Sequence, residues 1–95
     1  MIRHIVLTKL KEPTPALLEE AVSRIMQMEG KIEGLLSLEA GINYLDAERN
    51  YDLALVACFD TKEHAAAYVN HPVHLPVKKF MHEIRSGSVA IDYEF

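Results

Sequence analysis

The sequence predicts an α+β fold in which helical segments cover one face of a four-stranded antiparallel sheet. The chain has 95 residues, which is the size of a single domain, so we expect residues 1–95 to form one domain. The spacing of its apolar residues switches several times between the alternation of strands and the period of helices. The resulting order is strand, helix, strand, strand, helix, strand. This order is that of the ferredoxin-like, or split βαβ, fold.

The first strand and the first helix have clear sequence signals. Residues 2–10 are rich in Ile, Val and Leu and predict a strand. Thr14 can cap a following helix, and Pro15 suits its first position, where no backbone N–H is needed. Apolar side chains then recur at helical spacing, and Gly30 and Gly34 indicate where this helix has ended.

Three further strands follow from the pattern of apolar residues. Residues 36–44 alternate between apolar and polar side chains, which predicts a strand with one buried face. A polar stretch at residues 46–50 predicts a hairpin loop, and residues 53–59 are apolar throughout and predict a third strand. Residues 89–95 alternate again and predict the last strand.

The second helical region should be interrupted. Asp60 and Glu63 have the spacing of a capping box at the start of a helix that reaches Asn70. Because the residue before a proline avoids the helical region, this helix should break at Pro72. A second helical piece then runs from about Pro72 to Ile84.

The third strand is apolar on both faces, although the helices can cover only one face of the sheet. Leu53 and Leu55 lie on one face, and Ala54 and Val56 lie on the other. Exposed apolar patches on the order of a few hundred Å² mark interaction surfaces. We therefore expect a homodimer in which two sheets pack face to face as an α/β barrel. The alternative is a monomer with a partly apolar exposed sheet.

Composition excludes several classes of function. The net charge of -4 and the pI of about 5.7 argue against a nucleic-acid-binding surface, which is usually basic. No apolar run is long enough to cross a membrane, and the first residues lack the pattern of a secretory signal. Cys58 is the only cysteine, so no internal disulfide and no Cys-rich zinc site can form. We expect a cytoplasmic location.

The segment from Tyr68 to His74 contains the residues best suited to chemistry. Tyr68, His71 and His74 are three residues apart, so they could line one side of a kinked helix. If that helix starts at Pro72, His74 lies in its first turn, where the helix dipole disfavours a protonated imidazole. A neutral His74 can accept a proton, and Tyr68 can donate a hydrogen bond to a developing oxyanion. His74 and Tyr68 are therefore the predicted catalytic residues of a cofactor-free enolisation or aldol-type cyclisation.

The same residues also fit a structural role, which spacing alone favours. A histidine at a helix junction can hydrogen-bond to backbone carbonyls, and a tyrosine can be a core residue with a solvated hydroxyl. His4 and Val6 share one face of the first strand, and if that face looks toward the helices they border the same pocket. His4, Val6 and His71 are the predicted binding residues.

No metal or cofactor is predicted. The spacing of His71, His74 and His82 fits no strong zinc signature, and no carboxylate or cysteine completes a ligand set. The sequence has no G-x-G-x-x-G motif, P-loop or nucleophile elbow, so nucleotide and serine-hydrolase chemistry have no support. His64 and His82 stand among charged neighbours and are expected to be solvated.

Several segments together carry a resemblance to a known family. They are Arg3-His4-Ile5-Val6-Leu7, Gly34-Leu35, Asn50-Tyr51-Asp52-Leu53, Phe59-Asp60-Thr61, Tyr68-Val69-Asn70-His71-Pro72-Val73-His74 and Ala90-Ile91-Asp92-Tyr93. Through them essentially the whole chain resembles the stress-responsive α/β-barrel (Dabb) family. The resemblance implies a ferredoxin-like fold and a dimer built around a face-to-face barrel.

The resemblance also implies functional residues. A polyketide cyclase of that family performs a cofactor-free aldol condensation with a Tyr and a His in a segment like this one. That match carries over to Tyr68 and His74, and His4 matches a histidine that lines the cavity in that enzyme. Three hypotheses follow: a small-molecule cyclase or isomerase, a non-catalytic stress-related dimer, and a cofactor-free monooxygenase.

Overall fold

The computed structural model describes all 95 residues and contains four strands and three helices. In chain order the elements are β1 (Ile2–Leu10), α1 (Pro15–Met26), β2 (Leu35–Ile42), β3 (Leu53–Phe59), α2 (Lys62–Tyr68), α3 (His74–Ile84) and β4 (Arg85–Glu94). The strands form one antiparallel sheet in the order β2-β3-β1-β4. This arrangement confirms the ferredoxin-like prediction, with the second helical region divided into α2 and α3. No helix is both long and apolar enough to cross a membrane.

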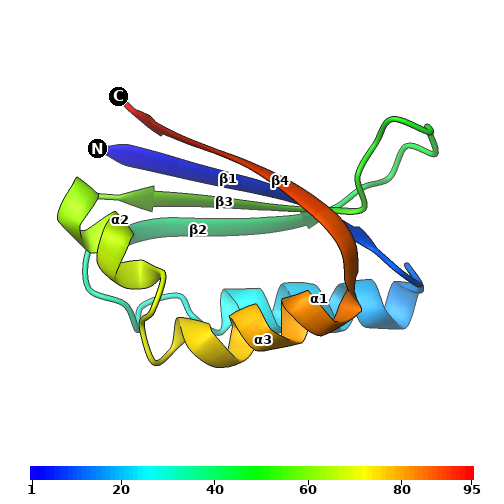
Figure 1. Ribbon diagram of the computed structural model, residues 1–95, viewed down its shortest axis with the longest axis horizontal. Helices are drawn as coiled ribbons and strands as arrows, with labels where there is room; N and C mark the ends of the chain where they lie inside the picture. Colours follow the sequence, from blue (N-terminus) through cyan, green and yellow to red (C-terminus); the bar gives the residue numbers. More distant parts are fainter.

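The helices lie on one face of the sheet. Figure 1 shows α1 and α3 below the sheet and α2 at one end, while no helix covers the opposite face. The core fills the layer between sheet and helices, and Ala21, Ile25, Met28 and Phe59 are almost completely inaccessible there. The structure therefore buries one sheet face and leaves the other uncovered, as the pattern of apolar residues predicts.

The uncovered face, which we call the open face, is apolar at its centre. Ile5 of β1 pairs with Val56 of β3 on one side and with Ile91 of β4 on the other. Leu7 pairs with Val89 one step further along the two strands. The exposed fractions are 37% for Leu7, 48% for Val89 and 56% for Ile91, so about half of each side chain remains in contact with solvent.

The first helix begins as the sequence predicts. The Thr14 hydroxyl accepts a hydrogen bond from the backbone N–H of Leu17 at 3.2 Å, and Pro15 is the first helical residue. After α1 the chain turns at Gly30 and Gly34, which have φ angles of 77° and 83°. Only glycine adopts such angles without steric cost, so these two residues fix the path from α1 into β2.

The second helical region differs in detail from the prediction. The residue that caps α2 is Thr61 and not Asp60, because the Thr61 hydroxyl accepts from the backbone N–H of His64 at 3.1 Å. The next helix begins at His74 and not at Pro72. The reason is a turn in which the carbonyl of His71 accepts from the backbone N–H of His74 at 2.9 Å.

The last strand is longer than predicted. It begins at Arg85, directly after α3, whereas the alternation of apolar residues starts only at Val89. The earlier residues are polar or glycine, but they continue the ladder with β1, where Thr8 pairs with Ser88 and Lys9 pairs with Gly87. Backbone pairing therefore extends β4 beyond the part that its side chains indicate.

Candidate functional site

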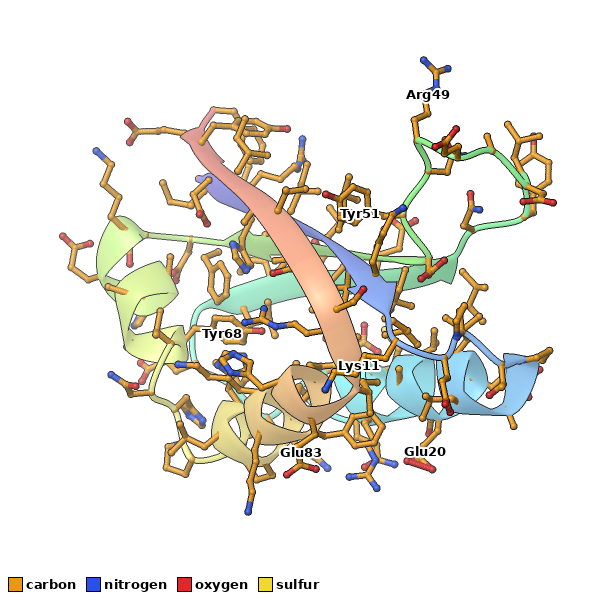
Figure 2. All side chains as sticks on the ribbon, turned by 45° about the vertical axis from the view of Figure 1, so that its right-hand side comes forward. Lys11, Glu20, Arg49, Tyr51, Tyr68 and Glu83 are labelled. Carbon is orange, nitrogen blue, oxygen red and sulfur yellow. The ribbon has the colours of Figure 1, made fainter.

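A cavity of about 180 Å³ lies between the sheet and α3. Figure 2 shows Tyr68 in this layer, between the strands and α3. The cavity is lined by residues of β1, β3, α1, α2 and α3 and by the first residue of β4. These residues are His4, Val6, Thr8, Ile25, Met28, Leu53, Leu55, Tyr68, His74, Val77, Lys78, Met81, His82 and Arg85.

His74, the first residue of α3, is held in one tautomer. Its Nδ1 lies 2.9 Å from the carbonyl oxygen of Tyr68 and 3.2 Å from that of Val69. Because a carbonyl only accepts hydrogen bonds, Nδ1 carries the proton and Nε2 keeps its lone pair. Burial lowers the pKa of His74, and the nearby charge of Lys78 lowers it further, whereas the two carbonyl contacts oppose the shift. The result is a neutral imidazole with a basic Nε2.

Tyr68 lies flat against this imidazole. The two ring centroids are 3.9 Å apart with an interplanar angle of 17°, and the ring of Phe59 packs at 5.2 Å. Burial raises the pKa of Tyr68 to about 12, so the phenol keeps its proton at neutral pH. The Tyr68 hydroxyl has no hydrogen-bond partner within the chain. Every fully buried side-chain oxygen or nitrogen in this structure does have a partner, so the hydroxyl is not fully buried. The hydroxyl therefore reaches accessible space and can donate to a ligand.

The side chain of His4, on β1, faces the helices. Its Nδ1 lies 2.5 Å from Oδ1 of Asp92, which is its partner residue across the β1–β4 pair. Its ring centroid is 6.0 Å from that of Tyr68, in an edge-to-face arrangement. Since the carboxylate accepts the Nδ1 proton, the His4 Nε2 is the nitrogen left for other contacts. Val6, two residues further along β1, borders the same cavity.

A second hollow adjoins this site. It has a volume of about 230 Å³ and shares His4, Tyr68, His74 and Lys78 with the first cavity. These four side chains therefore stand where the two spaces meet. All four border the first cavity as well as the second.

His71 does not join this group. It lines neither cavity, and its Nδ1 accepts a hydrogen bond from the backbone N–H of Val73 at 3.0 Å. Its role in the structure is to shape the turn between α2 and α3, which in turn orients His74. The structure thus brings together His4, Val6, Tyr68 and His74, and leaves His71 apart from them.

Sequence analysis missed the three other basic residues of the cavity wall. Lys78, His82 and Arg85 follow His74 at intervals of four, four and three residues, which is the spacing of one helix face. That spacing was available in the sequence, but it does not show that this side of the helix faces the cavity. His82 is exposed, as expected, but it borders the cavity as well.

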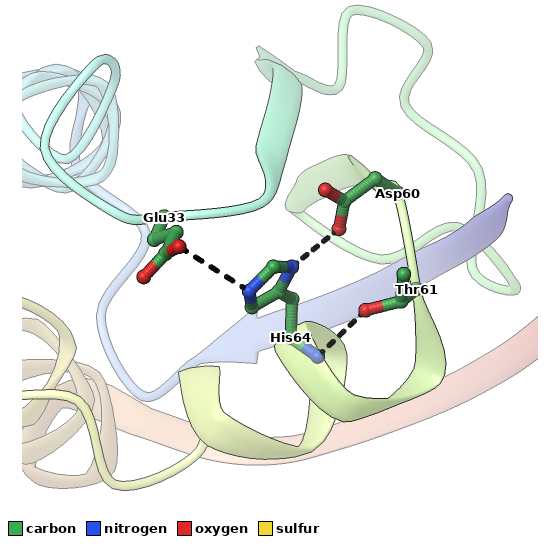
Figure 3. A network of polar contacts seen from close by, with 4 residues as sticks. All are labelled: Glu33, Asp60, Thr61 and His64. Atoms are coloured by element: carbon green, nitrogen blue, oxygen red, sulfur yellow. Dashed lines mark hydrogen bonds and ion pairs between the residues drawn. The ribbon is translucent and has the colours of Figure 1, made fainter.

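His64 lies outside the cavity in a polar network of its own (Figure 3). Its Nδ1 is 2.6 Å from Oδ1 of Asp60, and its Nε2 is 3.7 Å from Oε1 of Glu33. The hydrogen bond with Asp60 is the main reason why the pKa of His64 is raised. The side chain is still 33% exposed, so it is solvated as expected, but the hydrogen bond was not predicted, although Asp60 and His64 have the spacing of four residues that favours it.

No metal centre is formed. The structure contains no group of three or more His, Cys, Asp or Glu side chains that could hold a metal ion. The carboxylates of Asp60 and Glu33 approach different nitrogens of the His64 ring, so these three do not converge on one point.

Comparison with known proteins identifies relatives of the whole chain. Residues 2–95 match the family described as Stress responsive A/B Barrel Domain (Dabb). A dimeric protein of unknown function and ferredoxin-like fold from Bacteroides fragilis shares 28% identity, with a TM-score of 0.86 over 99% of this chain and 95% of that one. A dimeric ferredoxin-like protein of unknown function from Thermobifida fusca shares 27% identity, with a TM-score of 0.89 over 99% and 90%. No curated protein matches the chain.

An enzyme also shares the fold at lower identity. The hydroxynitrile lyase from Passiflora edulis is 14% identical, with a TM-score of 0.81 over 97% of this chain and 90% of that one. At this identity the likeness shows the fold alone.

Proposed function

The chain belongs to the stress-responsive A/B barrel domain family, and on this premise we propose that it binds a small organic molecule at Tyr68 and His74 and moves a proton on it without a cofactor. One observation supports this proposal above all. The carbonyls of Tyr68 and Val69 hold the proton on Nδ1 of His74, which leaves Nε2 as a base at the cavity.

The two side chains have complementary acid–base properties. The pKa of His74 is lowered by burial and that of Tyr68 is raised to about 12, so at neutral pH one is an acceptor and the other a donor. Pairs of groups whose pKa values are pushed apart by their surroundings are typical of acid–base catalysis. General acid–base catalysis of this kind contributes roughly 10²–10⁴-fold to a rate.

The proposed step is the formation of an enol from a carbonyl compound. His74 Nε2 takes a proton from the carbon next to the carbonyl group, and the electron pair of that C–H bond moves toward the carbonyl oxygen. Tyr68 donates a hydrogen bond to this oxygen as negative charge develops on it. Where the substrate is a β,γ-unsaturated carbonyl compound, the enolate is conjugated, and return of the proton from His74 to the γ-carbon shifts the double bond and completes an isomerisation. Attack of the enolate carbon on a second carbonyl of the same molecule, followed by protonation of the new alkoxide, completes an aldol-type cyclisation.

The size of the cavity limits the ligand. An apolar protein cavity of about 150 Å³ can hold benzene. The cavity here has a volume of about 180 Å³, so it takes a molecule of about one six-membered ring with a small substituent. Its lining is largely apolar with a few polar side chains, which is the usual composition of a small-molecule site.

We further propose that the protein works as a homodimer. The open face carries Leu7, Val89 and Ile91, each about half exposed and adjacent through the β1–β4 pair. Two relatives that cover nearly the whole chain are described as dimeric. A second copy packed face to face covers this apolar surface and leaves the cavity on the helix side of each sheet open to ligand.

Deuterium exchange tests the proposed chemistry without a known substrate. Small cyclic ketones such as cyclohexanone are incubated with the protein in D₂O, and loss of the α-proton signals is followed by NMR. We expect exchange above the buffer rate, loss of that excess in His74→Gln, and a reduction of about 100- to 1,000-fold in Tyr68→Phe, because one oxyanion donor is removed.

A matched control separates catalysis from folding. His64→Gln removes a histidine outside the cavity and should leave exchange unchanged. If wild type and His74→Gln exchange at the same rate while both remain folded, the catalytic proposal is wrong. The non-catalytic alternative predicts that these substitutions change only the melting temperature.

A further inference from the structure

We propose that the cavity selects anionic ligands, namely small monocarboxylates with an apolar body of about one ring, and that Lys78 holds the carboxylate. This inference rests on the proposed function and specifies the substrate class of that site. It follows from the charge of the cavity wall, from the ion pairs that this wall lacks, and from distances along α3.

The polar part of the cavity wall carries basic side chains and no acidic ones. Besides apolar residues and Tyr68, the wall consists of His4, Thr8, His74, Lys78, His82 and Arg85. The chain as a whole has a net charge of -4, so this wall has the opposite sign to the rest of the molecule. Cavities lined by one sign of charge concentrate ligands of the other sign.

The two full cations of this wall have no carboxylate partner in the chain. Arg24 and Lys62 form ion pairs elsewhere, at 3.1 Å and 3.5 Å, but neither Lys78 nor Arg85 does. Arg85 donates a hydrogen bond only to the hydroxyl of Ser88, at 2.7 Å. A half-buried cation without a counterion favours the binding of an anionic ligand.

The one carboxylate near the site is already engaged. Asp92 borders the adjoining hollow, and its Oδ1 accepts from His4 at 2.5 Å. This contact orients His4, and no ion pair joins Asp92 to Lys78. The positive charge of Lys78 is left for a ligand that touches both Lys78 and His74.

Distances along α3 select Lys78 as the anchor. An α-helix rises about 1.5 Å per residue, so the backbone of Lys78 is about 6 Å from that of His74 along the axis. A carboxylate beside Lys78 therefore leaves the neighbouring carbon atoms next to His74 and Tyr68. Arg85 lies about 16 Å from His74 on the same measure, which is too far for a one-ring ligand to reach both. Arg85 contributes to the positive electrostatic potential of the cavity but does not contact the carboxylate of the ligand.

The remaining wall accepts the apolar body. Val6, Leu53, Leu55 and Met28 close the cavity from the sheet and the end of α1, and none of them offers a polar group. A ring placed there is removed from water while its carboxylate stays at Lys78. A neutral ligand of the same shape gains the apolar contacts of the ring but lacks the charge–charge interaction with Lys78.

The test compares two probes that differ in charge and little in shape. Dissociation constants of benzoate and benzamide are measured by NMR titration with the full-length protein at low salt. We expect benzoate to bind about tenfold more tightly than benzamide, because a charge-assisted hydrogen bond replaces a neutral one. Lys78→Gln should weaken benzoate binding about tenfold and leave benzamide binding unchanged, and Arg85→Gln should have a smaller effect that disappears as salt is added.

Lys79→Gln is the matched control. Lys79 is the next residue of α3 and has the same charge, but it is exposed and lines neither of the two adjoining cavities, so the variant should bind both probes as wild type does. Equal affinity for the two probes, or equal effects of Lys78→Gln and Lys79→Gln, would overturn the inference. If benzamide still binds and ketone exchange persists in that case, the proposed function stands alone. If neither probe binds, this inference fails, and the ketone exchange experiment alone decides the proposed function.

Discussion

Substitution of Ile91 by aspartate should separate the proposed dimer into monomers. Ile91 lies on the open face, pairs with Ile5 and is 56% exposed. Complete burial of an isoleucine side chain contributes about 1.5–3 kcal/mol, so covering the exposed half contributes about 1 kcal/mol per copy. Each substitution counts twice in a symmetric interface, which gives about 2 kcal/mol. Two unpaired carboxylates in the interface cost several kcal/mol more.

The expected loss of at least ~4 kcal/mol corresponds to an increase of about 10³-fold in the dimer dissociation constant. Sedimentation at micromolar concentration measures this directly: wild type should run as a dimer and Ile91→Asp as a folded monomer. Leu75→Asp is the control, because Leu75 is 45% exposed on α3, away from the open face. A wild-type monomer, or an Ile91→Asp dimer of unchanged affinity, would refute the reasoning.

Three further predictions, which involve four substitutions, test the fold. Gly34→Ala should lower the melting temperature more than Gly30→Ala. Both substitutions place a side chain at positive φ, which costs about 1–2 kcal/mol each, but only a Cβ at position 34 overlaps the His64 side chain. Equal changes in melting temperature would contradict this contact. His64→Gln should destabilise the protein more at about pH 6 than at about pH 8. The pKa of His64 is raised by Asp60, so its contribution is complete below the ordinary value of 6.5 and is lost as pH rises through the folded-state pKa; a difference in melting temperature that grows with pH would have the wrong sign. Phe59→Ala should cost about 3–5 kcal/mol in denaturant unfolding, because this side chain has no exposed surface, and a loss below 1 kcal/mol would show that the core collapses around it.

Strands β1 and β3 and the first helix were predictable because their signals are local. The apolar runs of β1 and β3 give the observed bounds, and Thr14 and Pro15 give the start of α1. The uncovered apolar face was also predictable. The third strand is apolar on both sides, and two helices can cover only one side of the sheet, so the other side needs a different partner. These features depend on side-chain period and on capping chemistry, which a single sequence displays.

The junction between α2 and α3 was not predictable in detail. Its geometry depends on His71, whose ring nitrogen accepts from Val73 and whose carbonyl accepts from His74, and such a turn has no period to detect. The same applies to the start of β4, where pairing with β1 extends the strand through residues that do not alternate. The basic wall of the cavity was missed for a different reason. Lys78 and Arg85 look like solvated residues of an amphipathic helix until the position of β1 shows what they face.

The protonation of His74 is the point on which the account of the site depends. Nitrogen-15 NMR of the imidazole, followed through a pH titration, reports both the tautomer and the pKa. We predict a proton on Nδ1, a free Nε2, and a titration midpoint below the ordinary value of 6.5. A proton on Nε2, or a midpoint above 6.5, would contradict the assignment of His74 as the base.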